Sequence, residues 1–384
     1  MFKNLILNLL LLVSATICYA QINNPIIHNV RLFDGNKVYE NMTIVTENEK
    51  IIEISQTAEI TKTSENVING TGYTLLPGLI NAHFHTRSKK NLEEAAASGV
   101  LCILDMKINS SLSFTKLKEL SKEPKYPYFF STDIAVTVPK GHAAGIKKET
   151  VQSEENTGKF VGELIDGGAD FVKIVLDNGF NNNRPTLTDK MLETTIQVAT
   201  ARNKLTVAHI AAYDDAVKVA SMGVSGLAHV WIFDSLQIPE KKLQILKSSD
   251  IFIVPTLYVY QRGIDLKGWP INMEYVKSDV LRLYEAGIPI LAGSDPGNNK
   301  VNYGDDMIQE LKQLASCGIP NLEVLKSATS NASNAFHLGD IGFVKEGASA
   351  DFILVKGDPT VNIDDLYNLE GIWKNGRFIT PNKK

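Results

Sequence analysis

Short apolar runs alternate with amphipathic segments along the middle of the 384-residue chain. Eight strand-like runs occupy residues 75–82, 100–106, 128–138, 170–176, 205–208, 226–230, 251–256 and 288–293. Helical spacing separates most of them, for example after Thr188, a residue suited to cap a helix, and from Tyr213 to Met222, before Gly223. Strands joined by helical crossovers predict an α/β fold, a (β/α)8 TIM barrel over residues 75–338.

Both ends of the chain show strand patterns without helical spacing. Short β-rich segments at 26–27, 42–45 and 51–54 are separated by polar turns. Near the other end, 351–355 is strand-like, and Asn375 and Gly376 lie between two apolar arms, a combination typical of a type I′ hairpin. We therefore predict one small β-sandwich domain formed by residues 21–74 together with 339–384.

The first twenty residues have the pattern of a secretory signal peptide. A basic start at Lys3 and a short apolar run precede the small residue Ala20, which predicts cleavage there and an exported mature chain, periplasmic or secreted. Cys18 would also suit a lipoprotein signal, but Ile17 is bulkier than the small residue expected before it. No later run approaches the roughly 20 apolar residues that cross a bilayer, so no membrane span is predicted.

Charge and cysteine content narrow the function classes. The formal charge of −4 becomes −5 when Lys3 leaves with the signal peptide, and no basic patch indicates a nucleic-acid partner. Cys102 lies in a strand-like run and Cys317 ends a helix-like one, so we expect two separate thiols and not a disulfide. The sequence leaves the oligomeric state open, a homo-oligomer included.

Polar residues recur where the predicted strands end. They are His83 and His85 after the first, Lys173 in the fourth, His209 after the fifth, His229 after the sixth and Asp295 after the eighth. Imidazole and carboxylate suit metals such as Zn²⁺, and the carboxyl ends of barrel strands face one cavity. Taken singly, each residue also fits a strand end, a buried histidine or a turn. Lys173 is a donor only, so it could bind a metal only if neutralised or converted by CO2 to a carbamate.

As a set, these residues resemble the amidohydrolase superfamily, in particular its binuclear members with a carboxylated lysine, the imidazolonepropionase-like and prolidase-like group. The similar segments are 76–85, 171–174, 293–295, 328–332 and 347–352, with the two later histidines. The resemblance implies that His83, His85 and Asp295 hold a buried metal ion, that His209 and His229 hold a more exposed one, and that carboxylated Lys173 bridges both. Since the group also has mononuclear members, two ions are a prediction.

The resemblance also implies a reaction. Hydroxide held by two divalent ions, with zinc the expected metal, would attack an amide carbonyl while Asp295 shuttles the proton to the leaving nitrogen. His142 and Tyr213 are expected to bind the small-molecule substrate, and Tyr258 could line the same pocket. We expect an exported metal-dependent hydrolase of carbon–nitrogen bonds, with a prolidase-like dipeptidase as the leading reading. Alternatives are a cyclic amidase or lactonase using the same site, or an inactive binding relative, although all six metal positions are filled.

Overall fold

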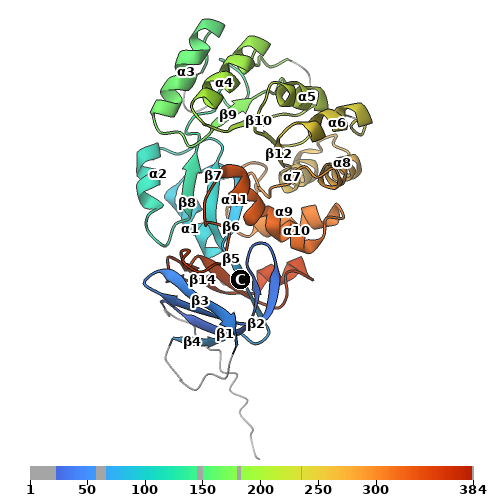
Figure 1. Cartoon of the computed structure of the whole chain (residues 1–384). Coiled ribbons are helices and arrows are strands. Elements are labelled where there is room, and N and C mark those ends of the chain that lie inside the picture. The colour runs from blue at the N-terminus through green and yellow to red at the C-terminus, as the bar shows by residue number, and fades with distance from the viewer. Residues whose placement is uncertain (1–22, 58–65, 145–149, 180–182, 235, 383–384) are drawn as a thin grey trace, which may run out of the picture.

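The computed structural model describes residues 23–57, 66–144, 150–179, 183–234 and 236–382 (Figure 1). The predicted signal peptide at 1–20 lies outside these residues. Among the helices of the described part, none has the length and apolar character needed to cross a membrane. Cys102 and Cys317 are buried free thiols, as the sequence predicts.

Strands from both ends of the chain form one sheet, seen as blue and red arrows at the lower end of Figure 1. The sheet has eight strands in the order β15-β14-β13-β5-β1-β2-β3, with β4 beside β1. The two ends meet where β5 and β13 pair antiparallel, with Leu75 opposite Leu354. The strands are β1 (Ile26–Phe33), β2 (Val38–Glu47), β3 (Lys50–Gln56), β4 (Val67–Asn69), β5 (Tyr73–Pro77), β13 (Phe352–Lys356), β14 (Leu369–Lys374) and β15 (Arg377–Ile379).

The predicted hairpin near the C-terminus is confirmed. Asn375 and Gly376 connect β14 to β15 with φ angles of 50° and 65°, and two consecutive positive values are what a type I′ turn requires. The sheet encloses its own apolar cluster, in which Ile44, Phe352 and Trp373 have no exposed surface.

Parallel strands form the middle of the chain. One sheet has the order β6-β7-β8 and another the order β12-β11-β10-β9. Their bounds are β6 (Leu79–Phe84), β7 (Val100–Asp105), β8 (Tyr128–Ser131), β9 (Val172–Val175), β10 (Thr206–His209), β11 (Gly226–Ala228) and β12 (Phe252–Val254). These sheets confirm the predicted α/β class with parallel strands.

Two predicted strands are shorter than expected. The run 128–138 is a strand only over Tyr128–Ser131, followed by an isolated bridge at Val136, because Asp133 takes a left-handed φ of 59° that breaks the extended chain. The run 288–293 makes a single bridge, between Ile290 and Ile253. Pro289 has no N–H to donate there, although its carbonyl accepts the Ile253 N–H at 2.9 Å.

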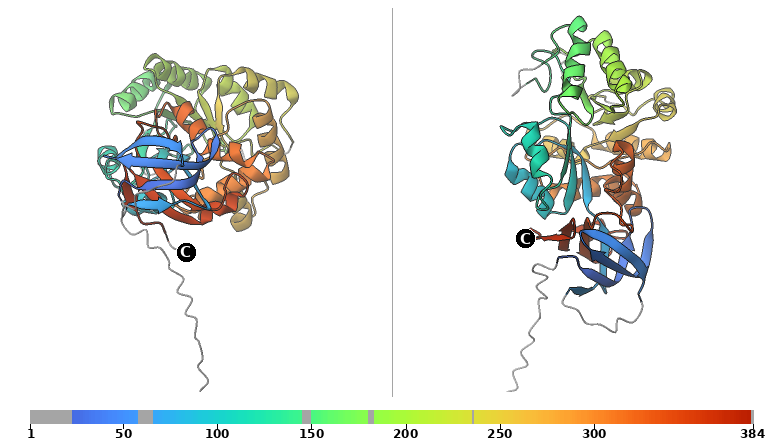
Figure 2. Two further views of the ribbon diagram at one scale, coloured as in Figure 1. Left: turned by 60° about the horizontal axis from the view of Figure 1, so that its bottom comes forward. Right: turned by 60° about the vertical axis from the view of Figure 1, so that its left-hand side comes forward.

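Helices lie beside the parallel strands on the outside of the molecule (Figures 1 and 2). They are α1 (Lys89–Ala97), α2 (Phe114–Leu120), α3 (Glu154–Asp166), α4 (Asp189–Ala201), α5 (Tyr213–Ser221), α6 (Glu240–Ser248), α7 (Leu257–Lys267), α8 (Met273–Glu285), α9 (Asp306–Ser316), α10 (Asn321–Ser327) and α11 (Ser330–Phe336), with a 3-10 turn η1 (Ile363–Tyr367). The predicted cap of α4 is present, since Thr188 Oγ1 accepts the Met191 N–H at 3.3 Å.

A buried lysine connects the terminal sheet to the middle of the chain. Lys374, at the end of β14, is fully buried, and its Nζ donates to the carbonyls of Ser121 and Tyr126, each at 2.7 Å. The same ammonium lies 4.0 Å from the centroid of the Tyr128 ring. Burial lowers the pKa of Lys374 to about 8. These contacts fix the sheet against the segment that carries β8.

Candidate metal centre

Five of the seven histidines in the chain form a continuous row of imidazoles. Successive ring centroids lie 5.2 Å apart for His85 and His83, 4.7 Å for His83 and His229, 4.2 Å for His229 and His209, and 4.7 Å for His209 and His142. Four of these residues are predicted metal ligands and the fifth, His142, is a predicted substrate contact. The structure therefore brings strand-end residues from β6, β10 and β11 to one place.

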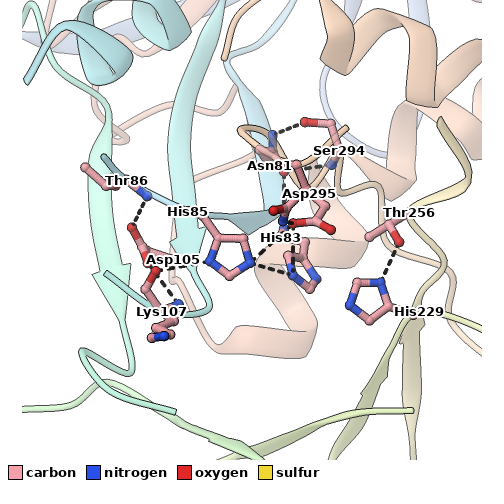
Figure 3. Close-up of polar contacts among 11 residues, drawn as sticks. Asn81, His83, His85, Thr86, Asp105, Lys107, His229, Thr256, Ser294 and Asp295 are labelled. Atoms are coloured by element: carbon pink, nitrogen blue, oxygen red, sulfur yellow. Dashed lines mark hydrogen bonds and ion pairs between the residues drawn. The ribbon is translucent and has the colours of Figure 1, made fainter. Parts of the chain in front are cut away.

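His83, His85 and Asp295 form the more buried group (Figure 3). The Nε2 atoms of the two histidines lie 3.3 Å apart, and Asp295 Oδ1 lies 3.7 Å from His83 Nε2 and 3.2 Å from His85 Nε2. Two ligands on one tetrahedral zinc ion, each bonded at about 2.1 Å, are separated by about 3.4 Å. The spacing of the three atoms thus suits one shared ion.

The tautomer of His85 supports this reading. Its Nδ1 lies 3.1 Å from the Lys107 carbonyl oxygen, which can only accept, so Nδ1 carries a hydrogen and, in the neutral ring, Nε2 has the lone pair. That lone pair faces His83 Nε2 and a carboxylate oxygen. Such a cluster of acceptors in a buried place is favourable only around a cation or a proton.

Asp105 orders the turn that carries His85. Its two carboxylate oxygens accept the Thr86 N–H at 2.8 Å and the Lys107 N–H at 3.0 Å (Figure 3). Burial raises the pKa of Asp105 to about 6, although the neighbouring His85 opposes that shift. Asp105 thereby positions both His85 and the carbonyl that fixes its tautomer. Asp105 is the last residue of β7 and lies within the predicted strand 100–106, but the sequence analysis did not single it out.

Asn81 joins the two segments of the buried group. Its Oδ1 accepts the His83 N–H at 3.2 Å and the Ser294 N–H at 3.1 Å, and its Nδ2 donates to Ser294 Oγ at 2.8 Å (Figure 3). The backbone adds a further bond, from the Asp295 N–H to the His83 carbonyl at 3.0 Å. The sequence analysis gave Asn81 no role, although a polar residue inside the apolar run 75–82 is a signal that could have revealed it.

Thr256 and Glu310 position the side chain of His229. It has a left-handed φ of 73°, and its Nδ1 lies 2.7 Å from Thr256 Oγ1. Thr256 also has a left-handed φ, 54°, and the next two N–H groups, of Leu257 and Tyr258, are accepted by buried Glu310 at 2.9 and 2.7 Å. Burial raises the pKa of Glu310 to about 8. Glu310 therefore fixes the turn whose threonine orients His229.

Lys173 lies in β9 with its Nζ buried and without a hydrogen-bond partner in the described part of the chain. Burial lowers its pKa from 10.5 to about 7, although Asp295 opposes the shift. Its charge lowers the pKa of His83, His209 and His229, so Lys173 lies near predicted ligands of both ions. An unpartnered buried amine that is neutral in about half of the molecules near pH 7 fits a site for carbamate formation, which consumes a neutral amine.

Asp177 is a carboxylate that the sequence analysis did not identify. Its side chain is 5% exposed, and its Oδ2 contacts His142 Nδ1 and lies 3.6 Å from His209 Nε2 and 3.3 Å from Arg184 Nη1. Burial works against ionisation, but the hydrogen bonds from His142 and His209 hold the pKa of Asp177 well below its usual range. Located in a polar loop before Asn178 and Gly179, it looks like an ordinary turn residue in the sequence.

The centre opens into a cavity of about 520 Å³. His142, Asp177, His209, His229 and Asp295 share its lining with an apolar wall that includes Ile232, Phe233, Val259, Tyr260 and Trp269. Of the predicted substrate residues, His142 lies in this cavity. Tyr213 and Tyr258 are not in its lining: Tyr213 stacks under the Lys242 ammonium, and Tyr260, two positions after Tyr258, faces His229 with ring centroids 5.8 Å apart.

The donor set suits metal ions. Burial lowers the pKa of His83 and His229 well below 6.5 and that of His209 to about 4, so these imidazoles are neutral and offer lone pairs. Neutral imidazoles with a carboxylate are ligands typical of zinc and similar divalent metals. His83, His85 and Asp295 could hold one ion, and His209 and His229 a second, with Lys173 between them.

A comparison of the sequence with known families agrees with this geometry. The profile of the amidohydrolase family matches residues 74–381, which is most of the chain. The chain belongs to the amidohydrolase family. It is therefore a hydrolase, and its relatives act on carbon–nitrogen bonds.

Individual members of the amidohydrolase family are distant from this chain. An uncharacterized protein of Mycobacterium tuberculosis is 25% identical over 335 residues, covering 81% of this chain and 86% of its own. A 5-methylthioadenosine/S-adenosylhomocysteine deaminase of Dictyoglomus turgidum is 22% identical and covers 86% and 84%. A crystal structure of a Xaa-Pro dipeptidase with bound methionine superposes with a TM-score of 0.79 at 18% identity, covering 92% and 99%. At that identity the likeness concerns the fold.

Proposed function

We propose that this amidohydrolase cleaves an amide bond with two divalent metal ions, as a dipeptidase of the prolidase-like kind. The observation that carries the proposal is the row of imidazoles between two carboxylates, Asp295 and Asp177, with the unpartnered amine of Lys173 close to His83, His209 and His229. His83, His85 and Asp295 would hold the inner ion. His209 and His229 would hold the outer ion, and Lys173, as a carbamate, would contact both.

Bound divalent ions supply a nucleophilic oxygen from water at neutral pH and polarise the carbonyl to be attacked. Asp295 lies at the inner group and also lines the cavity, so its carboxylate can accept the proton of the attacking water and deliver it to the leaving nitrogen. Asn298 Nδ2 donates to Asp295 Oδ1 at 2.7 Å and keeps the carboxylate oriented for that transfer. Proton transfer by a positioned side chain contributes about 10² to 10⁴-fold in rate.

The cavity favours a substrate with an apolar part and a polar end. Ile232, Phe233 and Trp269 can pack an aliphatic or ring-shaped side chain, while His142 can hydrogen-bond a carbonyl or carboxylate. Arg184 and Lys267 in the same lining favour a negative charge at the far end of the substrate. A dipeptide with an apolar residue and a free carboxylate fits these groups. The solved Xaa-Pro dipeptidase supports this class only through its fold.

A screen of the zinc-loaded mature protein tests the proposal. We expect turnover of dipeptides or N-acyl amino acids, and loss of turnover on chelation that is restored by added zinc. Cyclic amides and lactones are the rival substrates, since the same residues could open them, and they belong in the same screen. Less than about half an equivalent of tightly bound metal per chain after growth with zinc or manganese would contradict the proposal, because a catalytic ion is held by at least three protein ligands.

The proposal also covers barrel closure, the shape of the terminal domain and export of the protein. We propose that the parallel strands and the bridged segments at Val136 and Ile290 close into a (β/α)8 barrel, because the Ala82 N–H donates to the Ala292 carbonyl at 2.9 Å and links β6 to the last segment. We propose that the terminal sheet folds over its own core as a sandwich. Export with cleavage after Ala20 completes the proposal, and mass spectrometry of the secreted mature protein tests it.

A further inference from the structure

We infer that Asp177 is a ligand of the outer metal ion, an inference that rests on the proposed function. The outer ion would then have a carboxylate of its own beside His209 and His229, as the inner ion has Asp295. Neither the sequence pattern nor the likeness to known proteins pointed to this residue.

The position of Asp177 is the first support. It follows β9, four residues after Lys173, and its side chain is 5% exposed within the cavity lining. Oδ1 is fixed by the Gly179 N–H at 2.7 Å. This bond turns the other oxygen, Oδ2, toward His142 and His209. The carboxylate is thus built into the site and directed at a predicted ligand of the outer ion.

The distance between Asp177 and His209 is the second support. Asp177 Oδ2 and His209 Nε2 lie 3.6 Å apart, close to the 3.7 Å between Asp295 Oδ1 and His83 Nε2 in the inner group. Two ligands of one tetrahedral zinc ion are about 3.4 Å apart. His142, Asp177 and His209 together place one ligand atom each within 4.8 Å of one another, as do His83, His85 and Asp295.

A salt bridge to Arg184 is the competing explanation for Asp177. Arg184 Nη1 lies 3.3 Å from Asp177 Oδ2, but the arginine side chain is 41% exposed, and an exposed partner contributes little to an ion pair. Hydrogen bonds from His142 and His209 stabilise the ionised carboxylate in the metal-free chain, so a metal ion would have to replace the His209 contact by a stronger one. A divalent ion between Asp177 and His209 would provide that stronger contact from inside the cavity.

Metal binding to Asp177→Asn tests the inference. The mature protein and the variant are loaded with zinc and freed of excess metal. Bound zinc is then counted by mass spectrometry, and the affinity of each ion is measured by competition with a chromophoric chelator. We expect two ions in the parent protein. In Asp177→Asn the affinity for one ion should fall more than about 100-fold, beyond the 10- to 100-fold typical for residues that only support a ligand.

Asp279→Asn is the matched control. Asp279 is also a buried aspartate paired with an arginine, since it accepts from Trp231 Nε1 at 2.6 Å and from Arg282 Nη1 at 3.1 Å, but it does not line the cavity. This control should keep both ions at parent affinity. If Asp177→Asn also keeps both, Asp177 is not a ligand and the inference is overturned while the proposed function stands. If the parent protein itself binds less than half an equivalent, both are overturned.

Two further variants separate a ligand from a supporting group. His142→Gln should keep two ions, and a loss as large as that in Asp177→Asn would mean that Asp177 acts through His142, against the inference. Arg184→Ala, an exposed change that should fold even if Asp177→Asn does not, removes a cation beside Asp177. It should tighten the weaker ion if the carboxylate is a ligand. Unchanged or weaker binding in Arg184→Ala would count against the inference.

Discussion

Asn81 and Ser294 hold each other by two hydrogen bonds, one in each direction. Asn81 Nδ2 donates to Ser294 Oγ at 2.8 Å, and Asn81 Oδ1 accepts the Ser294 N–H at 3.1 Å. Asn81 lies two residues before His83, and Ser294 directly precedes Asp295. The pair therefore sets the distance between two predicted ligands that come from distant parts of the sequence.

Replacing Asn81 by alanine should lower both the stability of the protein and the metal affinity of the inner group, His83, His85 and Asp295. The N–H groups of His83 and Ser294 would lose their buried acceptor, at a cost of about 1–3 kcal/mol for each unsatisfied group. We expect a lower free energy of unfolding and inner-ion affinity reduced about 10- to 100-fold. Chemical unfolding and zinc competition measure the two effects. Asn91→Ala, a half-buried position of α1 whose side chain hydrogen-bonds with Ser88 and Glu94 of the same segment, is the control; it should change stability by no more than about 1 kcal/mol and leave zinc affinity unchanged. Parent-like zinc affinity in Asn81→Ala would contradict the prediction.

Gly293→Ala tests the close approach of the last segment to β6. A Cβ atom at this position would lie 2.7 Å from His83 N and 2.6 Å from Val254 Cγ1, so the backbone of His83, a predicted metal ligand, would have to move. We expect a loss of about 1–3 kcal/mol in unfolding free energy, the usual cost of overpacking, together with weaker zinc binding. Gly158→Ala in α3 meets nothing closer than 3.6 Å and should instead stabilise the protein by up to about 1 kcal/mol. Equal effects of the two changes would argue against this reading of Gly293.

Asp295→Asn separates proton transfer from metal binding. The amide keeps the size of the side chain and an oxygen ligand, but it cannot accept a proton. Zinc affinity should fall as well, so zinc is supplied in excess; under that condition turnover should fall about 10² to 10⁴-fold while more than half of the zinc remains bound. Steady-state kinetics and metal analysis on the same sample measure both quantities. Turnover near that of the parent would remove Asp295 as the proton shuttle.

Glu310 should make stability depend on pH. Burial raises its pKa in the folded chain from 4.5 to about 8, so between these values the folded state binds a proton that the unfolded state has lost. By linkage, this contribution is complete below pH 4.5 and is lost as the pH rises through about 8. In metal-free protein, Glu310→Gln should therefore flatten the fall in unfolding free energy over this window. Urea unfolding at a series of pH values measures the slope, and an identical slope in the variant would refute the assignment.

The gathering of several predicted ligands at one place could be foreseen because these residues end or directly follow buried strands. His83 ends an apolar run, and His209 and His229 each follow one, so a strand pattern is enough to place them on one face. The same logic failed for Asp177. It lies beyond the end of β9 in a loop with Asn178 and Gly179, where an aspartate usually stabilises a turn, and only the three-dimensional path of that loop turns it toward His209.

The residues that line the cavity were harder to predict for a related reason. Position 258 was chosen because it follows a predicted strand, but the left-handed Thr256 starts α7 at once, and the helical turn brings Tyr260 to the cavity in place of Tyr258. A residue with positive φ, Asp133, also shortened the strand expected at 128–138, whereas in the run 288–293 the missing N–H of Pro289 limits pairing. Local spacing in a sequence does not reveal where a single residue adopts positive φ.

The pairing of β5 with β13 has a consequence for how the chain is made. Leu75 leaves the ribosome early and Leu354 among the last residues, so β5 has an unpaired edge throughout most of synthesis. Non-local pairing of this kind forms slowly, and an open strand edge invites association with other chains. A chain that ends before β13 would keep that edge exposed permanently. The segment from β13 onward therefore protects the chain against aggregation as well as completing the sheet.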